Sequence, residues 1–570
     1  MIAIENIYLF LNYMKKCDDN KLIAYLSRYF KHEQSKFLVI QGASLLMGIL
    51  AFVLIYGVKV INPFCIDFLR VEGDPGQHYY GWELYRISDW FVKPGLFNYA
   101  SYPYSVSVIF TDSIPLMAVL TKWFLNGTDV RIQYFGIWEL ICFALQGYFA
   151  AKLIKTKTDK GIVVFWGSVL FILSPCMLRR VFWHSALSAH FLILIALLLY
   201  EKAKKNSLIK NAVCWGILGI LCASIHLYFV AICGIILGGF CIKVLEEGKK
   251  GLLKAAMSAG AFCTMSYLVI YLLGGTVSGM DNGAPGVGYY GLNLKSFIQP
   301  DDGWSQFVPN IEYFEGGQYE GFVYLGLGVL ILLIIAALLE VYTKWSCVAK
   351  QSLFEVLSEL AIVIVTLIVS TGNIACFGKV KLFDYYLGAD IEGLLSIVRA
   401  NGRVAWILVY LILLSVLTKL SQMNFHKGVL LTILICAVGL NIVDLYPRLA
   451  EKNKEYTNIT EYENSMEIVQ RFIDSSPFEY KHIVLLEKDD LNQKQLYDLA
   501  DIAIENKLTL NDFYFARSFN GNVNELAVKS AKEKKADSIY ILPKKDIHYT
   551  FRYDLNWLDE GDIYIGYCGW

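Results

Sequence analysis

The first long apolar run of the chain reads Phe37-Leu-Val-Ile-Gln-Gly-Ala-Ser-Leu-Leu-Met-Gly-Ile-Leu-Ala-Phe-Val-Leu-Ile-Tyr56. A helix needs about 20 apolar residues to cross the roughly 30 Å hydrocarbon core of a bilayer, and this run supplies them. The segment before it is rich in lysine and arginine, as cytoplasmic segments of membrane proteins are. We therefore predict that residues 37–61 form the first span and that residues 1–36 stay in the cytoplasm as an uncleaved leader.

Further apolar runs follow along the chain, near residues 130–151, 161–178, 185–200, 208–224, 226–243, 252–273, 321–341, 353–371, 403–418 and 428–445. The composition agrees with a membrane protein, because 56% of the residues are hydrophobic and only 18% are charged. The sequence predicts an α-helical polytopic membrane protein with about 11 spans. The net charge of zero gives no reason to expect a nucleic-acid partner.

Thirteen cysteines are present, and most lie inside these runs, where a thiol acts as a small buried hydrophobe. The sequence contains no CxxC pair or Cys/His spacing typical of structural zinc.

One apolar stretch, Val106–Phe124, contains Asp112 and Pro115. If it spans, the lysine-rich loops after it fall outside the cell. If it only lies on or dips into the outer face, all of those loops are cytoplasmic, which is the usual distribution. We predict the second arrangement, with outer loops at residues 62–129, 274–320 and 372–402. The acid and the proline predict a broken helix that lines a cavity, and an interfacial turn with Asp112 in water is the alternative.

From about Tyr446 the composition becomes charged and typical of a soluble domain. His482–Leu486 and Ser538–Leu542 predict strands, and Asn492–Asn506 and Asn522–Lys535 predict helices, because their apolar residues recur every three to four positions. We predict a small α/β domain, residues 446–570, on the extracytoplasmic side of a bacterial plasma membrane.

The first outer loop opens with Arg70-Val-Glu-Gly-Asp-Pro-Gly-Gln-His-Tyr-Tyr-Gly-Trp-Glu-Leu-Tyr-Arg86. Pro75 suits the first turn of a short amphipathic helix, so Asp74 is a candidate N-cap. Capping alone is the alternative to catalysis, and the two are compatible because a helix N-terminus stabilises a fixed carboxylate. The candidate catalytic acids are Asp74, Glu72 and Asp112.

Arginines gather at the outer ends of two predicted spans. Arg179 and Arg180 end one span, shortly before His184 and His190, and Arg399 and Arg403 flank the start of another. Guanidinium groups suit bidentate binding of phosphate oxygens, and the alternative is snorkelling to lipid headgroups. His184 is a candidate cavity residue, whereas His190 is more typical of helix packing.

The candidate binding set also includes His78 and Trp82 in the first outer loop and Trp304 and Glu320 in the second. Aromatic rings here could stack on sugar faces, and an interfacial aromatic belt is the alternative. Asp301-Asp302 resembles a metal-binding acid pair, although a lone pair does not specify a metal site.

Several stretches resemble an uncharacterised family of bacterial membrane proteins that is grouped near the GT-C glycosyltransferases. They are Gly73-Asp-Pro-Gly-Gln-His-Tyr-Tyr-Gly-Trp82, Phe110-Thr-Asp-Ser-Ile-Pro-Leu116, Gln318-Tyr-Glu-Gly-Phe-Val-Tyr-Leu-Gly326 and Val398-Arg-Ala-Asn-Gly-Arg403. The cytoplasmic N-terminus, the acid-bearing first outer loop and the outward C-terminal domain also look like a GT-C enzyme. GT-C enzymes usually carry adjacent acids in that loop, whereas here the acids are spaced as Glu-Gly-Asp.

The resemblance implies transfer of a sugar from a polyprenyl-phosphate donor to the hydroxyl of a glycan or lipid acceptor on the outer leaflet. Asp74 would then act as the general base, and the reaction would invert the anomeric centre. Arg179, Arg180, Arg399 and Arg403 would hold the departing lipid phosphate. A requirement for a divalent metal ion is left open.

Three other classes of function stay open at the level of sequence. A transporter or flippase for lipid-linked glycans would use the same basic cavity, although we find no matching halves with paired broken helices. A polysaccharide polymerase needs a similar outer cavity, and an acyltransferase would centre on a histidine such as His184 or His190. A structural scaffold would leave the acids and arginines without a role.

Overall fold

The computed structural model describes residues 19–125, 128–276, 286–342, 352–396, 398–515, 517, 523–544 and 553–569. The first part of the predicted leader, and residues 277–285 of the predicted second outer loop, lie outside the described residues.

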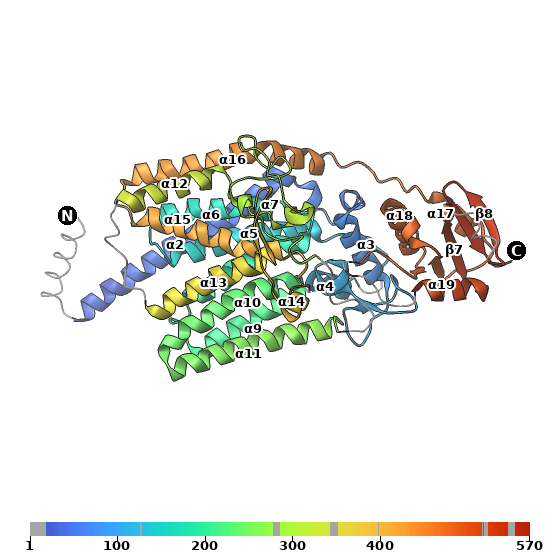
Figure 1. The fold of residues 1–570 in the computed structure, drawn as a ribbon, viewed down its shortest axis with the longest axis horizontal. Coiled ribbons are helices and arrows are strands. Elements are labelled where there is room, and N and C mark those ends of the chain that lie inside the picture. Colours follow the sequence, from blue (N-terminus) through green and yellow to red (C-terminus); the bar gives the residue numbers. More distant parts are fainter. Residues whose placement is uncertain are drawn as a thin grey trace.

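A bundle of long apolar helices forms the larger part of the molecule (Figure 1). Within the described residues, nine helices are long and apolar enough to cross a membrane, and the segments Ser185–Glu201 and Leu327–Val341 are shorter apolar helices. Together they correspond to the predicted spans. The eleven segments contain α2 (Asp19–Tyr56), α5 (Phe135–Lys155), α8 (Phe191–Glu201), α9 (Leu208–Ile225), α10 (Leu227–Val244), α11 (Lys249–Leu272), α12 (Leu327–Tyr342), α13 (Leu353–Thr371), α15 (Trp406–Gln422) and α16 (Lys427–Thr457). The remaining segment, Gly161–Leu178, is made of two helices, α6 (Gly161–Ile172) and α7 (Pro175–Leu178).

The lysine-rich ends of these helices meet at one end of the bundle. Lys157 pairs with Glu201 at 2.7 Å, Lys204 pairs with Glu355 at 3.0 Å, and the Nζ of Lys160 donates to the carbonyl of Met423. The C-terminal domain lies beyond the opposite end (Figure 1). The two ends therefore differ as the lysine distribution predicts, and which end faces the cytoplasm stays a prediction.

The segment between α2 and α5 covers the end that faces the C-terminal domain. It contains α3 (Asp74–Ile87), the short hairpin β1 (Leu96–Phe97) and β2 (Val106–Ser107), the 3-10 turn η3 (Val108–Thr111) and α4 (Pro115–Phe124). Because α4 has only 10 residues, it is about 15 Å long, half of the hydrocarbon thickness. This length fits the prediction that Val106–Phe124 does not span, and the membrane topology itself stays a prediction.

Helix α3 differs from its prediction in one respect. It was expected to be amphipathic, but all its residues from Gly76 to Arg86 are buried. Helix α3 is covered because the C-terminal domain packs on it through α18 (Gln493–Glu505).

The C-terminal domain is built on a five-stranded sheet of order β6-β5-β7-β9-β8. Strands β6 (Thr509–Leu510), β5 (His482–Leu485) and β7 (Ser538–Pro543) are parallel, and β9 (Ile563–Tyr567) and β8 (Asn556–Glu560) continue the sheet antiparallel. Helices α17 (Glu467–Ser475), α18 and α19 (Val523–Lys532) accompany it. The predicted strands β5 and β7 and helices α18 and α19 are confirmed, whereas β6, β8, β9 and α17 were not predicted.

Candidate active site

A cavity of about 430 Å³ lies at the end of the bundle that faces the C-terminal domain. Its polar walls come from far-apart parts of the chain: the start of α3, the turn between η3 and α4, the α7–α8 and α9–α10 junctions, the 3-10 helix η7 (Gly316–Gly321), the 3-10 helix η8 (Asn401–Ala405) and the loop after β6. The lining side chains that carry charge or an imidazole are Asp74, Asp112, His184, His226, Glu320, Arg399, Arg403 and Arg517.

Asp74 enters this cavity at the start of α3. Its Oδ2 lies 2.9 Å from Nε2 of His184. Burial alone would raise the pKa of the Asp74 carboxyl, but the attraction and hydrogen bond of His184 outweigh burial and hold that pKa below its usual value. Asp74 is therefore ionised at neutral pH.

The expected N-cap role of Asp74 is wrong by one residue. The N-cap is Gly73, whose φ of 89° and ψ of −164° suit only glycine, and Asp74 begins the helix. Because the chain turns at Gly73, the Asp74 side chain points to His184 and makes no capping hydrogen bond.

The C-terminal domain holds the backbone next to Asp74. Gln493 Oε1 accepts from the amide of Gly73 at 2.9 Å, and the Tyr497 hydroxyl donates to the Gly73 carbonyl at 2.9 Å. A Cβ on Gly76 would lie 2.5 Å from the Tyr497 ring, so the close approach of α18 to α3 requires glycine there. Both polar groups of Gly73 are thus bound by α18.

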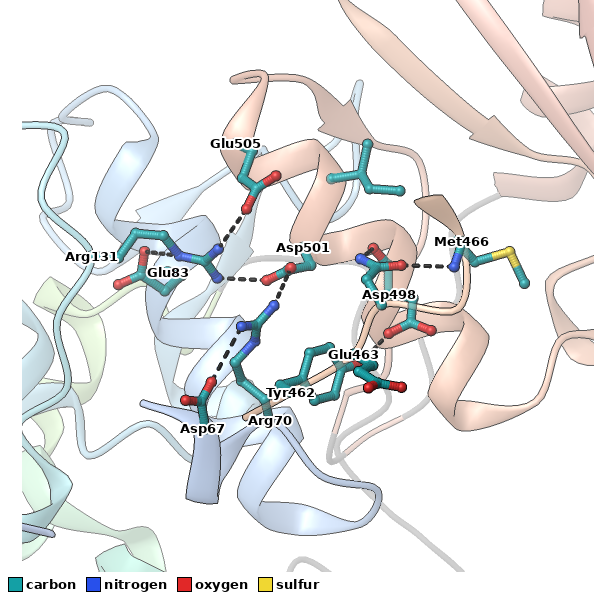
Figure 2. Close-up of polar contacts among 12 residues, drawn as sticks. Asp67, Arg70, Glu83, Arg131, Tyr462, Glu463, Met466, Asp498, Asp501 and Glu505 are labelled. Carbon is teal, nitrogen blue, oxygen red and sulfur yellow. Dashed lines mark hydrogen bonds and ion pairs between the residues drawn. The ribbon is translucent and has the colours of Figure 1, made fainter. Parts of the chain in front are cut away.

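Ion pairs fasten the same two surfaces together, as Figure 2 shows. Asp501 on α18 accepts from Arg70 just before α3 and, at 2.6 Å, from Arg131 just before α5. Arg131 also lies 3.3 Å from Glu505. The Arg70 guanidinium covers the ring of Tyr462, with 4.1 Å to the centroid. A carboxylate shared by two guanidiniums fixes the domain on the bundle in one orientation.

Asp112 faces Asp74 from the turn before α4, where its φ is 53°. His226, between α9 and α10, places Nε2 at 3.4 Å from Asp112 Oδ1 while its Nδ1 accepts from the amide of Tyr228. An acceptor Nδ1 leaves the proton on Nε2, so His226 donates to Asp112. Burial opposes the ionised form of Asp112, but the hydrogen bond from His226 and the nearby histidines bring its pKa below the usual value.

His78, Asp112 and His184 could hold a metal ion. Each offers one ligand atom, and these atoms lie within 4.8 Å of one another. His78 is 1% exposed and neither ring nitrogen has a hydrogen-bond partner, which is costly for a buried imidazole. Burial lowers the pKa of His78 to about 4, so the ring is neutral and able to ligate at neutral pH. Two imidazoles and a carboxylate suit zinc or manganese better than calcium.

The arginines divide into two groups. Arg403 places Nη2 at 2.9 Å from Glu320 Oε2, and Arg180 places Nη1 at 3.0 Å from the same oxygen. A Cβ on Gly402 would lie 2.6 Å from the Cα of Gly321, so two glycines in contact bring these neighbours together. Burial opposes the charge of Glu320, but Arg403 and Arg180 hold its pKa below the usual value. One carboxylate facing two guanidiniums leaves the cluster positive.

Arg399 is the exposed cation of the cavity wall, with its guanidinium 5.1 Å from the centroid of the Tyr290 ring. Within the described residues, no carboxylate forms an ion pair with it. Arg179 instead pairs with Asp301, which also accepts from Tyr313, and Asp302 pairs with Arg448. Asp301 and Asp302 therefore do not face one common site.

Not every predicted site residue lines the cavity. Asp74, Asp112, His184, Glu320, Arg399 and Arg403 line it, and His78 and Arg180 lie directly behind it, against His184 and Glu320 respectively. Glu72 is exposed outside it, Trp82 is buried and donates to the carbonyl of Ile132, and Trp304 is buried against Phe322. His190 packs among Phe229, Trp406 and Tyr410, the packing role that its position favours.

Sequence reasoning missed His226, Tyr228, Tyr290, Tyr514 and Arg517 in the cavity wall. His226 could have been found, because it is a polar residue at the junction of the apolar runs 208–224 and 226–243. Tyr514 and Arg517 carry no local signal, since only the docking of a separate domain brings them to the cavity.

Fold and site together define a polytopic helical membrane protein whose soluble α/β domain closes over a cavity of acids, histidines and arginines. Residues 45–446 match the family described as "Domain of unknown function (DUF6311)", and residues 472–564 match the DUF6311 C-terminal domain. The chain belongs to this family, and the predicted membership of an uncharacterised membrane-protein family is confirmed.

The chain is also similar to a solved structure, the Archaeoglobus fulgidus oligosaccharyltransferase tethered with an acceptor peptide. The identity is 10%, the match covers 88% of this chain and 69% of that chain, and the TM-score is 0.43. A likeness at this level says nothing about activity. The search of curated proteins gives no match.

Proposed function

We propose that this protein is a membrane glycosyltransferase of the outer face, which moves a sugar from a polyprenyl-phosphate donor to a glycan or lipid hydroxyl. The observation that supports this is the sharing of one cavity by a carboxylate, Asp74, and two cations, Arg399 and Arg403. Transfer from a lipid phosphate needs a group that accepts the hydroxyl proton and groups that stabilise the charge of the leaving phosphate.

Asp74 is the general base in this proposal. Its Oδ2 is fixed by His184, and the backbone before it is fixed by Gln493 and Tyr497, so the carboxylate is held before substrate arrives. The acceptor oxygen forms the new glycosidic bond as its proton passes to Asp74, and the bond from the anomeric carbon to the phosphate oxygen breaks. Direct displacement inverts the anomeric centre.

Arg399 receives the phosphate, because it lines the cavity without an ion-pair partner among the described residues. Arg403 contributes positive charge, because the single carboxylate of Glu320 cannot neutralise both Arg403 and Arg180. Arg179 and Arg180 take a supporting part, because both are already paired with carboxylates. A divalent cation held by His78, Asp112 and His184 would supply further positive charge beside the leaving group.

The decisive experiment uses the full chain in lipid nanodiscs with a labelled polyprenyl-phosphate sugar and an envelope glycan extract. Asp74→Asn keeps the shape of the side chain but removes its basicity, and we expect turnover to fall by about 10²–10⁴-fold. Asp159→Asn is the matched control, because Asp159 is exposed at the other end of the bundle.

Product analysis separates this function from its alternatives. Addition of a single sugar through a new glycosidic bond supports transfer. A sugar lipid moved across the bilayer unchanged would show a flippase, and addition of many repeat units to one chain would show a polymerase. Wild-type turnover by Asp74→Asn would reject Asp74 as the base.

A further inference from the structure

We propose that a second cavity, at the carboxyl ends of β5 and β6 in the C-terminal domain, binds an oligosaccharide acceptor and presents it to Asp74. The role of this oligosaccharide as the acceptor rests on the proposed function. Its binding to the cavity does not, and can be tested without turnover. We call this second cavity the crevice. Its volume is about 860 Å³, and it is lined by the loops after β5 and β6 and by the first residues of α18 and α19.

The crevice follows from the strand order. The chain runs from β5 through α18 to β6 on one side, then through α19 to β7 on the other side of β5. Ile483 and Leu485 of β5 share a core with Leu496 and Leu499 of α18, whereas Val484 and Leu486 pack with Ala527 and Ala531 of α19. The two helices therefore cover opposite faces of the sheet.

Loops that leave neighbouring parallel strands toward opposite faces separate, and the gap between them is where open α/β sheets bind ligands. A cavity is therefore expected at the carboxyl ends of β5 and β6. The crevice lies there, and its volume is within the range of known ligand sites.

The crevice suits a polar ligand that carries no phosphate, because its walls hold more carboxylates than cations. The carboxylates are Asp489, Asp512 and Glu525, and the cations are Lys488 and Arg517. Lys488 pairs with Asp512 at 2.9 Å and also donates to the carbonyl of Phe513, so these two charges neutralise each other. The walls add the rings of Tyr514 and Phe515 and the amides of Gln493 and Asn524. Rings for sugar faces and amides for hydroxyl groups are the chemistry that recognises an oligosaccharide, whereas a polyphosphate would need unpaired cations.

The crevice adjoins the catalytic cavity. Tyr514 and Arg517 line both of them, and Tyr514 is 42% exposed between the two. Gln493, a wall of the crevice, is the residue that accepts from the amide of Gly73. A sugar chain in the crevice thus ends beside Gly73, the residue before Asp74. The ion pairs of Figure 2 hold the crevice in this position relative to Asp74.

The test uses the full chain in nanodiscs and fluorescently labelled oligosaccharides released from the envelope of the producing bacterium. Fluorescence anisotropy reports binding without any donor lipid. We expect the wild type to bind, and Tyr514→Ala to raise the Kd about tenfold through loss of a stacked ring. Asn524→Trp should have a similar effect, because Asn524 is an exposed residue of the crevice wall and a tryptophan there fills the crevice. Phe478→Ala is the matched control, since Phe478 is an aromatic residue of the same domain with 41% exposure, outside both cavities.

Binding that is lost in both crevice variants and kept in Phe478→Ala supports the inference. The absence of wild-type binding overturns it, as does wild-type affinity in Asn524→Trp, which would place the sugar in the catalytic cavity alone. Tighter binding of labelled envelope peptides than of oligosaccharides also overturns it. Binding without sugar transfer would reject the proposed function and leave the crevice standing, whereas transfer with unchanged binding in both variants would do the reverse.

Discussion

The two ends of the helix bundle treat charge in opposite ways. At the lysine-rich end, the Lys204 and Glu355 side chains are 31% and 29% exposed, so water screens their attraction. At the cavity end, the Arg180 and Glu320 side chains are 2% and 9% exposed. Exposed pairs contribute about 0–1 kcal/mol, whereas a buried ion needs its partner to offset desolvation. The difference teaches that the Arg180–Glu320 pair depends on its partners for stability far more than the Lys204–Glu355 pair does.

Breaking the buried cluster gives the largest expected effect. Glu320→Gln leaves Arg180 and Arg403 facing each other without a carboxylate, so the free energy of unfolding should fall by about 3–5 kcal/mol. The measurement is unfolding of the purified protein in nanodiscs. Glu355→Gln at the lysine-rich end is the comparison, with an expected loss below about 1 kcal/mol. Equal losses at the two ends would contradict the contrast drawn between them.

Addition of a divalent cation tests whether His78, Asp112 and His184 bind a metal ion. Manganese or zinc at a hundred times its Kd should raise the free energy of unfolding of the wild type by about 2.7 kcal/mol, because it binds the folded state. His78→Ala removes one of the three ligand atoms, so the stabilisation should disappear. His426→Asn serves as control, since His426 caps the start of α16 and belongs to neither the cavity nor the set of ligands. Stabilisation that survives His78→Ala would exclude this set of ligands.

The interface between the bundle and the C-terminal domain contains a third kind of charge pair, which joins the two parts of the molecule. Asp501→Asn weakens the bonds to Arg70 and Arg131, and a hydrogen bond to a charged group contributes about 1.5–3 kcal/mol. Hydrogen exchange of α18 and α3 should therefore accelerate. Glu505→Gln, on the same helix but with a half-exposed side chain, should have a smaller effect. Unchanged exchange in Asp501→Asn would mean that the ion pairs do not hold the domain.

The sequence was sufficient where periodicity and composition carry the information. The apolar helices of the bundle and strands β5 and β7 all follow from runs of apolar residues, because membrane thickness and strand pairing require such runs. The acids and most arginines of the cavity were also selected, since charges beside apolar spans stand out. Short strands such as β6, with two residues, carry too little pattern to be recognised.

The sequence could not predict which charged and aromatic side chains contact one another in the folded protein. Arg179 and Arg399 look alike beside their spans, yet Arg179 meets Asp301 and Arg399 meets only an aromatic ring among the described residues. Tyr514 reaches the cavity only because α18 docks on α3. Such partners are decided by tertiary approach over hundreds of residues, for which a single sequence contains no direct signal.

The two hydrogen bonds from α18 to Gly73 tie the position of Asp74 to the docking of the C-terminal domain. A molecule whose soluble domain has swung away loses both anchors of the glycine before its proposed nucleophile-activating acid. Such a molecule would spare the costly lipid-borne sugar from being wasted on water. The proposed reaction would then require the C-terminal domain to be docked on the helix bundle.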